Sequence, residues 1–301
     1  MNKIIIIAGP TASGKTNLSV EIAKHLNTDI ISCDSMQIYK GMDIGTAKVS
    51  TSEMQGVKHH MIDIINPDQP FSVSDYFDMV KPIIDKLHAE NKIPLICGGT
   101  GLYIDAILYP LTMGAKDENI RNKLQLELEQ YGPEYMHNKL KEIDPLEAEK
   151  IHANNTKRVL RALEIYQITG QIKSDLNDRS KQLNYETLLI SLDFNRDELY
   201  NRINKRVDIM FENGLESEVR RLLNDGYSFD MQSMQAIGYK EFKDYFVNNL
   251  TIEEVKELIK KNTRHYAKRQ ITWFKRYDFA NWINPNNTDK IFDLINDFRE
   301  D

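Results

Sequence analysis

The sequence is poor in cysteine and has no long apolar run. Its two cysteines, Cys33 and Cys97, form no CxxC pair, which fits a protein of the reduced cytoplasm. No run approaches the roughly 20 apolar residues that a membrane-spanning helix needs. The run at 4–7 is too short for a signal peptide, and Gly9 and Pro10 follow it closely. We therefore expect a cytoplasmic protein without membrane association.

The composition is otherwise that of an ordinary soluble globular protein, with 41% hydrophobic and 28% charged residues. A length of 301 residues has room for one large domain, or for a core that carries an insertion. The net charge of −6 argues against a protein that coats nucleic acid indiscriminately, but it allows a local basic face. His59 and His60 lack a second ligand pair at metal-binding spacing, so we interpret them as structural, and we expect a monomer.

A phosphate-binding loop follows the first apolar run. Residues 9–16 read GPTASGKT, which matches the pattern G-x-x-x-x-G-K-T. The isoleucines at 4–7 predict a buried strand before the loop, and Leu18, Ile22 and Leu26 predict a helix after it. Inward-pointing backbone N–H groups, the lysine and the helix N-terminus would hold phosphates, and the threonine hydroxyl can bind Mg²⁺. The pattern, shared with nucleotide-binding and ATP-binding proteins, indicates a diphosphate or triphosphate; a chance glycine turn is the alternative.

Strands and helices alternate along the first hundred residues. We expect strands at 4–7, 30–33, 60–65 and 94–97, and a helix at 73–87. Such alternation predicts an α/β fold, a P-loop NTPase-like parallel sheet flanked by helices. Ligands of such sheets lie at the carboxyl ends of the strands. The segments 9–16, 34–37 and 98–101 are therefore expected around one crevice.

The pattern becomes charged and helical from about residue 114. Leu124, Leu128, Met136, Leu140 and Ile143 form an apolar stripe, and no strand-like run follows until 187–193. We therefore expect a helical insertion at 114–183. The P-loop α/β core would comprise 1–113 and 184–301, with C-terminal RNA-binding helices at 196–212, 214–225, 238–247 and 252–276.

Candidate catalytic groups lie at two strand ends. Asp34 follows the strand at 30–33, where a carboxylate could act as a general base or bind Mg²⁺ through water. The alternative role is a turn or helix cap. The polar segment 35–37 could read the edge of a base. The glycine-rich turn at 98–101 is a weaker signal, and Thr100 carries its usable hydroxyl.

Two stretches are basic. Residues 256–276 contain eight lysines and arginines against the single acid Glu257, with aromatic side chains between them. This pattern is typical of a nucleic-acid-binding face, although the cations could simply solvate a helix whose Trp273 and Phe274 belong to the core. In the second stretch, Arg158 and Arg161 are three residues apart and share one helix face. This face could bind RNA, or it could be a solvated face that includes Glu164.

These motifs together resemble the bacterial tRNA dimethylallyltransferases, or isopentenyl-diphosphate:tRNA transferases. The matching segments are GPTASGKT at 9–16, SCDSMQIY at 32–39, GTAK at 45–48, GGTGLY at 98–103, NNTKRVLRALEIY at 154–166, MQAIGYKE at 234–241 and AKRQITWFKR at 267–276. They follow the family's order over nearly the whole chain. The DSMQ, QAIGYK and KRQITWFK segments are the most specific, because many kinases share the phosphate-binding loop.

The resemblance implies transfer of a dimethylallyl group from its diphosphate to N6 of adenosine 37 in the tRNA anticodon stem-loop. Asp34 would be the general base, Thr100 would orient the amine, and Mg²⁺ would bind Thr16. The residues that would hold the diphosphate are Gly9, Thr11, Ala12, Ser13, Gly14, Lys15, Thr16 and Arg206. Those that would contact tRNA are Asp34, Ser35, Met36, Gln37, Thr100, Arg121, Lys157, Arg158, Arg161, Gln235, Gly238, Tyr239, Lys240, Lys268, Arg269, Gln270 and Lys275.

The chain departs from the family's pattern at two places. Val49 stands where the family usually has proline, and 112–122 matches poorly apart from Arg121. The insertion boundary and the role of Arg121 therefore stay open. A nucleotide or small-molecule kinase would use the same loop but leaves the basic stretch 256–276 unexplained. A non-catalytic RNA-binding protein leaves Asp34 without a chemical task.

Overall fold

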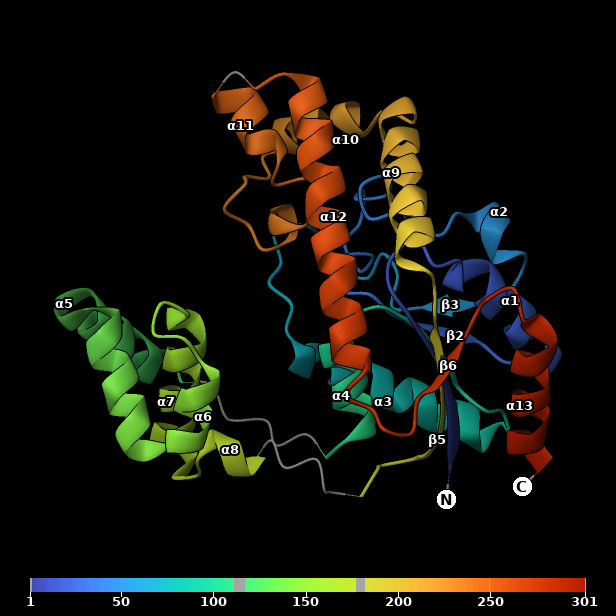
Figure 1. Ribbon diagram of the computed structural model, residues 1–301, viewed down its shortest axis with the longest axis horizontal. Helices are drawn as coiled ribbons and strands as arrows, with labels where there is room; N and C mark the ends of the chain where they lie inside the picture. Colours follow the sequence, from blue (N-terminus) through green and yellow to red (C-terminus); the bar gives the residue numbers. More distant parts are fainter. Residues whose placement is uncertain (1, 111–116, 177–181, 249, 301) are drawn as a thin grey trace. The chain divides into compact units, whose positions relative to one another are not determined.

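The structure is a computed structural model that describes residues 2–110, 117–176, 182–248 and 250–300 (Figure 1). The chain forms two compact units, one built from 1–108 with 184–301 and the other from 109–183. Each unit has its own hydrophobic core. The boundary expected at residue 114 lies outside the described residues.

A parallel sheet forms the centre of the first unit. Its strands are β1 (Lys3–Ala8), β2 (Ile30–Cys33), β3 (His59–His60), β4 (Leu95–Gly98), β5 (Glu186–Leu192) and β6 (Asn281–Ile283). They lie in the order β3-β2-β4-β1-β5-β6, and each neighbouring pair is parallel. Parallel neighbours need crossover connections, which the helices between them provide, so the predicted α/β fold is confirmed.

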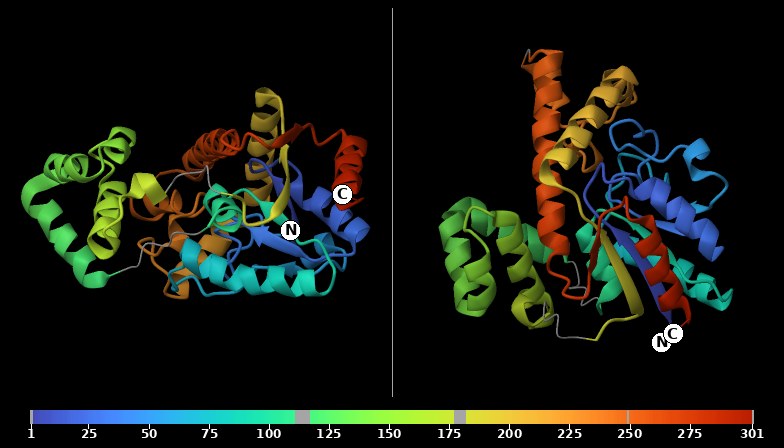
Figure 2. Two further views of the ribbon diagram at one scale, coloured as in Figure 1. Left: turned by 90° about the horizontal axis from the view of Figure 1, so that it is seen from below. Right: turned by 45° about the vertical axis from the view of Figure 1, so that its right-hand side comes forward.

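Helices cover both faces of this sheet (Figure 2). On one face, Ile5 and Ile7 of β1 pack in the cluster that includes α1 and α13. Ile4 and Ile6 alternate with them along the strand, point to the opposite face and are also fully buried. On that face Tyr76 of α3 donates its hydroxyl hydrogen to a carbonyl oxygen of β2 at 3.0 Å. A strand buried on both faces explains the unbroken isoleucine run.

The helices of the first unit are α1 (Lys15–Leu26), α2 (Thr51–Met54), α3 (Val73–Ala89), α4 (Gly101–Leu108), α9 (Arg196–Glu212), α10 (Leu215–Asn224), the 3₁₀-helix η1 (Ser233–Gln235), α11 (Phe242–Val247), α12 (Ile252–Phe274) and α13 (Thr288–Glu300). The helices expected at 196–212, 214–225 and 252–276 correspond to α9, α10 and α12. The two long helices α9 and α12 pack side by side above the carboxyl ends of the strands (Figure 1).

Three expectations differ from the structure. The strand expected at 60–65 ends at His60, because Met61 and Asp63 take left-handed conformations with φ of 63° and 53°. The helix expected from 238 begins at Phe242, because Gly238 has φ of 98° and cannot lie inside a helix. Strand β6 was not expected, since its three residues form no apolar run.

The second unit is helical. It contains α5 (Glu118–Ile143), α6 (Pro145–Lys150), α7 (Thr156–Thr169) and α8 (Lys173–Leu176). Its core holds Leu124, Met136 and Leu140 of the predicted stripe, with Leu128 and Ile143 packed at the edge. The apolar stripe is therefore confirmed. Gly132, with φ of 83°, bends α5, so that the two halves of the stripe face the same core.

Hydrogen bonds join the two segments of the first unit at the point where residues 109–183 interrupt it. The backbone N–H of Asn184 donates to the carbonyl oxygen of Leu108 at 2.9 Å. The Asn184 side chain donates to the carbonyl oxygen of Ile107 at 3.0 Å. The two ends of the first unit's interrupted chain are therefore joined directly.

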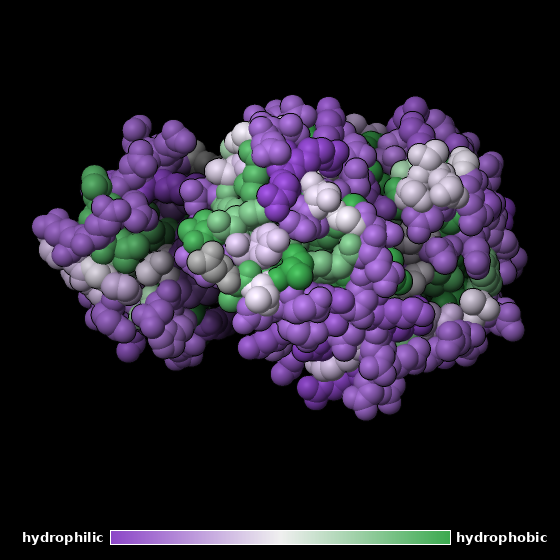
Figure 3. Space-filling view, turned by 90° about the horizontal axis from the view of Figure 1, so that it is seen from above, coloured by the Kyte–Doolittle hydropathy of each residue, from purple (hydrophilic) through white to green (hydrophobic). Residues whose placement is uncertain are grey.

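Hydrophilic side chains dominate the face seen from above, and hydrophobic residues form smaller groups between them (Figure 3). This distribution is expected where most apolar side chains have been used in the cores. Among the described residues, no helix has the length and apolar character needed to cross a membrane.

Candidate active site

A cavity of about 360 Å³ lies at the carboxyl ends of β1, β2 and β4. The phosphate-binding loop, residues 34–37 and the glycines 98–99 line it from the sheet side, and α9 and α12 line it from above. Parts of all three segments predicted to share a crevice therefore do so, namely 11–16, 34–37 and 98–99. Gly9, Thr100 and Gly101 are not among the described residues that line the cavity. The volume falls within the range of small-molecule sites.

The loop 9–16 has the backbone shape that its glycines and its short side chains allow. Gly14 has φ of 80° and directly precedes α1, and Ala12 has φ of 63°. The Lys15 ammonium donates to the carbonyl oxygens of Gly9 at 2.9 Å and Pro10 at 2.7 Å. Burial lowers the pKa of Lys15 to about 8. An anion bound in the loop would therefore offer this lysine a better partner than the loop carbonyls.

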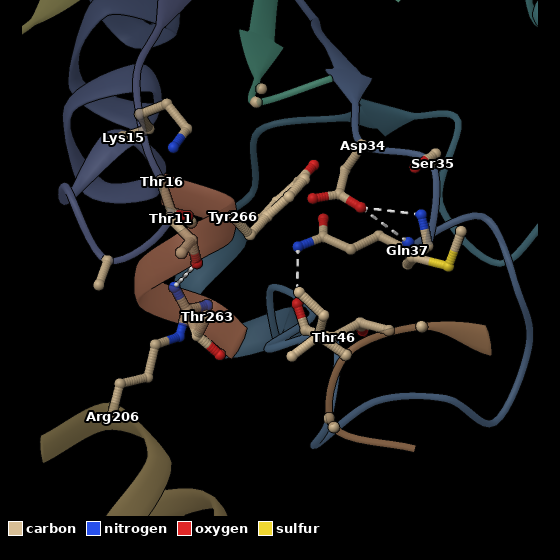
Figure 4. Close-up of a pocket in the computed structure, with 18 of the residues that line it drawn as sticks. Thr11, Lys15, Thr16, Asp34, Ser35, Gln37, Thr46, Arg206, Thr263 and Tyr266 are labelled. Atoms are coloured by element: carbon tan, nitrogen blue, oxygen red, sulfur yellow. Dashed lines mark hydrogen bonds between the residues drawn. The ribbon is translucent and has the colours of Figure 1, made fainter. Parts of the chain in front are cut away.

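Asp34 combines the two roles considered for it. Its carboxylate caps the turn that follows β2, and it also lines the cavity. Its Oδ1 accepts hydrogen bonds from the backbone N–H of Met36 at 2.8 Å and of Gln37 at 3.3 Å. These bonds fix the turn after β2 and the direction of the carboxylate. Figure 4 shows the carboxylate pointing into the cavity toward Tyr266 of α12. One oxygen thus holds the turn, and the other faces the space where a substrate would lie.

Thr100 links the two strand ends. Its Oγ1 accepts a hydrogen bond from the backbone N–H of Ser35 at 3.1 Å. The Thr100 side chain also forms a hydrogen bond with Tyr266. Burial and the charge of Asp34 raise the pKa of Tyr266, and the hydrogen bond with Thr100 lowers it. Tyr266 was not predicted as a site residue. It was visible in the sequence only as one aromatic residue within the basic stretch, with nothing to show that it faces the cavity.

Arg206 reaches the phosphate-binding loop from α9. Its Nη1 donates to Thr11 Oγ1 at 3.2 Å (Figure 4). Its Nη2 donates to the Ala47 carbonyl oxygen at 3.4 Å. Burial lowers its pKa, and Asp34 opposes that shift. The structure therefore brings the predicted second cation to the loop.

The Gln37 amide lies beside the Asp34 carboxylate (Figure 4). Its amide Nε2 donates to the carbonyl oxygens of Thr46 and Ala47, each at 3.3 Å. Ser35 and Met36 line the same cavity. These contacts fix the amide in place beside the carboxylate. The predicted base-reading group is therefore held rigidly at the cavity wall.

The glycines of the 98–101 turn are required by close packing. A Cβ on Gly98 would collide with the backbone of Cys33, one on Gly99 with the amide of Gln270, and one on Gly101 with the ring of Trp273. The end of β4 therefore approaches β2, and the turn after it approaches α12, as closely as glycine permits. Trp273 packs against this turn, in agreement with the alternative interpretation that it belongs to the core of the first unit.

Gln270 joins the turn to the phosphate-binding loop. It is 6% exposed. Its Oε1 accepts from the Thr11 backbone N–H at 3.0 Å, and its Nε2 donates to the Gly99 carbonyl oxygen at 2.9 Å. The structure thus places this predicted RNA contact between two backbone segments.

The other predicted RNA contacts of the first unit divide into exposed and buried groups. Exposed residues are Gln235, Lys240, Lys268, Arg269 and Lys275. Arg269 lies over the ring of Tyr266 at 5.6 Å. Gly238 and Tyr239 are buried. The exposed cations of α12 are available to a polyanion.

The remaining predicted RNA contacts lie in the second unit. Arg121 of α5 is exposed, as are Lys157 and Arg158 near the start of α7. Arg161 Nη1 lies 2.7 Å from a carboxylate oxygen of Glu164, so Arg161 forms an ion pair within its own helix. Exposure of the other three cations agrees with the predicted RNA contact.

Thr16 is the residue of the loop that the sequence pattern assigns to a metal ion. Thr16 lines the cavity, and its hydroxyl is a hard oxygen donor of the kind that Mg²⁺ prefers. Among the described residues, no group of three or more His, Cys, Asp or Glu side chains could hold a metal ion. A metal at Thr16 would therefore take most of its ligands from water and from a bound diphosphate, as Mg²⁺ commonly does.

Comparison with known proteins gives one consistent family. Residues 37–277 match the model of the family described as IPP transferase. The chain is 49% identical over 297 residues to the tRNA dimethylallyltransferase of Clostridioides difficile, covering 98% of this chain and 95% of that protein. It is 47% identical to the tRNA dimethylallyltransferase of Bacillus cytotoxicus, covering 97% and 93%.

Solved structures agree with this result. The tRNA isopentenylpyrophosphate transferase of Bacillus halodurans superposes with a TM-score of 0.76 at 44% identity, covering 100% of this chain and 97% of that one. A eukaryotic dimethylallyltransferase acting on tRNA superposes with a TM-score of 0.78 at 31% identity, covering 91% and 70%. The resemblance predicted from the motifs is therefore confirmed.

Proposed function

The chain belongs to the IPP transferase family, and we propose that it transfers the dimethylallyl group of dimethylallyl diphosphate to N6 of adenosine 37 in tRNA. The chain is an enzyme of the prenyltransferase class that modifies tRNA, as its relatives are. The observation that carries the detailed proposal is the shared cavity, in which the phosphate-binding loop and the Asp34 carboxylate face each other.

The phosphate-binding loop would hold the diphosphate. Its inward N–H groups, the start of α1 and the Lys15 ammonium offer positive charge to the phosphate oxygens. Arg206, already bonded to Thr11, adds a second cation at the same place. When the C–O bond of the allyl diphosphate breaks, the leaving oxygen takes the bonding electrons. These groups stabilise the charge that develops there.

Thr16 would hold Mg²⁺ beside the loop, with diphosphate oxygens and water completing its coordination. When bound, the metal neutralises part of the negative charge of the diphosphate. The fit rests on the threonine hydroxyl at the cavity wall. Asp34 stays on the opposite wall, held by the turn that follows β2.

Asp34 would act as general base. The adenine N6 attacks the allyl carbon, the new N–C bond forms as the C–O bond breaks, and one N6 proton passes to the carboxylate. An exocyclic amine is a poor nucleophile, and a positioned base accelerates such a step by roughly 10²–10⁴-fold. Thr100, adjacent to Asp34 through Ser35, would orient the amine.

The adenine must leave its stack to enter the cavity. Extrusion costs a few kcal/mol and less in a loop than in a duplex, which favours an anticodon loop as the substrate. Gln37, with its amide fixed beside Asp34, is placed to bind the edge of a base. The exposed cations Lys268, Arg269 and Lys275 would bind the phosphates of the stem-loop.

The direct test is incubation with unmodified tRNA and Mg²⁺, in the presence of either dimethylallyl diphosphate or ATP. We expect a prenylated adenosine on nucleoside analysis with the first compound and no consumption of the second. A kinase would reverse both results. A binding protein without catalytic activity would retain tRNA and change neither compound.

A further inference from the structure

A buried carboxylate from α10 holds the loop that contacts Gln37. Glu218 is 5% exposed and lies against residues 43–45. The backbone N–H of Asp43 donates to its Oε2 at 2.9 Å, that of Ile44 to both oxygens at 2.9 and 3.1 Å, and that of Gly45 to its Oε1 at 3.1 Å. Three successive N–H groups thus form an anion-binding concavity that the chain fills with its own side chain.

Tyr239 completes this contact. Its hydroxyl donates to Glu218 Oε1 at 2.6 Å, and its side chain is fully buried. A Cβ on Gly45 would collide with the Tyr239 ring, so the loop lies directly on the ring. Each Glu218 oxygen therefore accepts at least two hydrogen bonds, and the loop has little freedom to shift.

The same loop carries the carbonyl groups that hold the Gln37 amide. Thr46 and Ala47, which follow directly after the three N–H donors, accept both hydrogen bonds of Gln37 Nε2. Thr46 is further tied by its own hydroxyl, which donates to the Met42 carbonyl oxygen at 2.6 Å. The orientation of the Gln37 amide therefore depends on a loop whose position Glu218 determines.

We infer that Glu218 is a positioning residue that sets the geometry of Gln37, and through it the recognition of the target base in tRNA. The inference rests on the proposed function for its assay. It assigns to α10, which does not line the cavity, a role in substrate discrimination. Diphosphate binding should depend on Glu218 less than tRNA recognition does, because Lys15 is held by the carbonyl oxygens of Gly9 and Pro10 within the phosphate-binding loop. Arg206, which donates both to Thr11 and to Ala47, links the two loops and should transmit a small effect.

Glu218→Gln tests this inference with a change of almost no volume. An amide has only one acceptor oxygen, so its NH₂ group would face backbone N–H donors that now bind a carboxylate. A mispaired buried donor should displace the loop. We expect kcat/KM for tRNA to fall about tenfold to a hundredfold. The affinity for dimethylallyl diphosphate should fall much less, by about threefold at most, through the bond from Arg206 to Ala47.

Glu216→Gln is the matched control on the same helix. Glu216 is partly exposed, pairs with Arg220 at 2.6 Å and accepts a hydrogen bond from the Tyr245 hydroxyl at 3.2 Å. Since these partners lie outside the 43–47 loop, the same substitution there should leave transfer unchanged. Wild-type kinetics in Glu218→Gln would overturn the inference. If the wild-type protein shows no transfer at all, the proposed function is overturned instead. Hydrogen exchange of the Ile44 and Gly45 amides would then still test, independently of the transfer assay, whether Glu218 holds the loop.

A double-mutant cycle separates positioning from simple stabilisation. If Glu218 acts through Gln37, then Gln37→Ala should cost much less in the Glu218→Gln background than alone. If the reductions in kcat/KM caused by the two substitutions simply multiply in the double mutant, the inference is overturned. Should Glu218→Gln fail to fold, Gly45→Ala moves the same loop by collision with Tyr239, and the same cycle with Gln37→Ala decides the question. Faster exchange of the two amides in either loop variant supports the inference, and unchanged exchange contradicts it.

Discussion

Lys15 carries a charge that solution pH should control within an accessible range. Its folded-state pKa of about 8 lies below the ordinary 10.5 because burial disfavours the ammonium, so the free protein loses this proton as pH rises through about 8. A diphosphate favours the charged form and raises the pKa again. We therefore expect proton uptake on binding at pH 8.5, and an affinity that falls by up to about tenfold for each pH unit above 8.

Calorimetry in two buffers of different ionisation enthalpy measures that uptake. Lys15→Ala is the control, since it should bind dimethylallyl diphosphate weakly and without proton uptake. The same affinity in this variant as in the wild type would remove the phosphate-binding role from the loop.

Asp34 should be separable from diphosphate binding. Asp34→Asn keeps an acceptor oxygen for the turn after β2 but removes the base, so we expect kcat to fall by about 10²-fold or more. Affinity for dimethylallyl diphosphate should change little, because Lys15 and the loop remain. Single-turnover kinetics measure the step directly. A variant with near wild-type rate would leave Asp34 as a turn cap only, and an affinity restored by high Mg²⁺ would instead indicate a metal ligand.

At the scale of a secondary-structure element, α12 both binds the two loops and presents cations to solvent. Its buried side, through Gln270, holds the phosphate-binding loop and the 98–101 turn together. Gly99→Ala would drive a methyl group into the Gln270 amide, so we expect a loss of diphosphate affinity and of thermal stability. Because the two residues share one contact, Gln270→Ala and Gly99→Ala should be non-additive in a double-mutant cycle. Additive losses of stability would contradict this coupling.

The exposed side of α12 should determine how tRNA binding depends on salt. Replacing Lys268, Arg269 and Lys275 with alanine should reduce the slope of log affinity against log salt by about 0.7–1 for each phosphate group that the protein no longer neutralises. Lys86→Ala on α3, an exposed cation outside the cavity, is the control. An unchanged slope in the triple variant would mean that these cations only solvate the helix.

Elements were predictable from the sequence where their signal was local. The isoleucine run and the glycine motif predict β1, the phosphate-binding loop and α1 because each is defined by neighbouring residues. The strand expected at 60–65 was wrong from Met61 onward, where Met61 and Asp63 take left-handed conformations. Methionine gives no signal for such a conformation, and a single aspartate gives only a weak one. The roles of Tyr266 and Glu218 were not predicted, for a different reason. Their roles come from partners at Thr100 and 43–45, more than a hundred residues away in the chain.

At the scale of the whole molecule, the first unit should retain diphosphate binding without the second. All residues that line the cavity belong to 1–108 and 184–301. The bond between Asn184 and Leu108 places the two ends within reach of a short Gly/Ser linker in place of 109–183. We expect the shortened chain to bind dimethylallyl diphosphate within a fewfold of the full chain and to bind tRNA more weakly. Equal tRNA affinity would show that Arg121, Lys157 and Arg158 do not bind the RNA.

The hydrogen bond between Leu108 and Asn184 also bears on how the chain folds. Strand β5 pairs with β1 although most of the first two hundred residues lie between them in the chain. The interrupting segment 109–183 alone is on the order of 75 residues long. Closing a flexible loop of that length costs on the order of 4 kcal/mol in chain entropy. The helical unit makes mainly local contacts and can form early. Once it has folded, the helical unit acts as a short bridge between Leu108 and Asn184, so the flexible chain between β1 and β5 shortens from about 180 to about 100 residues. The pairing of β1 with β5 stays long-range, and its closure entropy falls by about 0.5 kcal/mol.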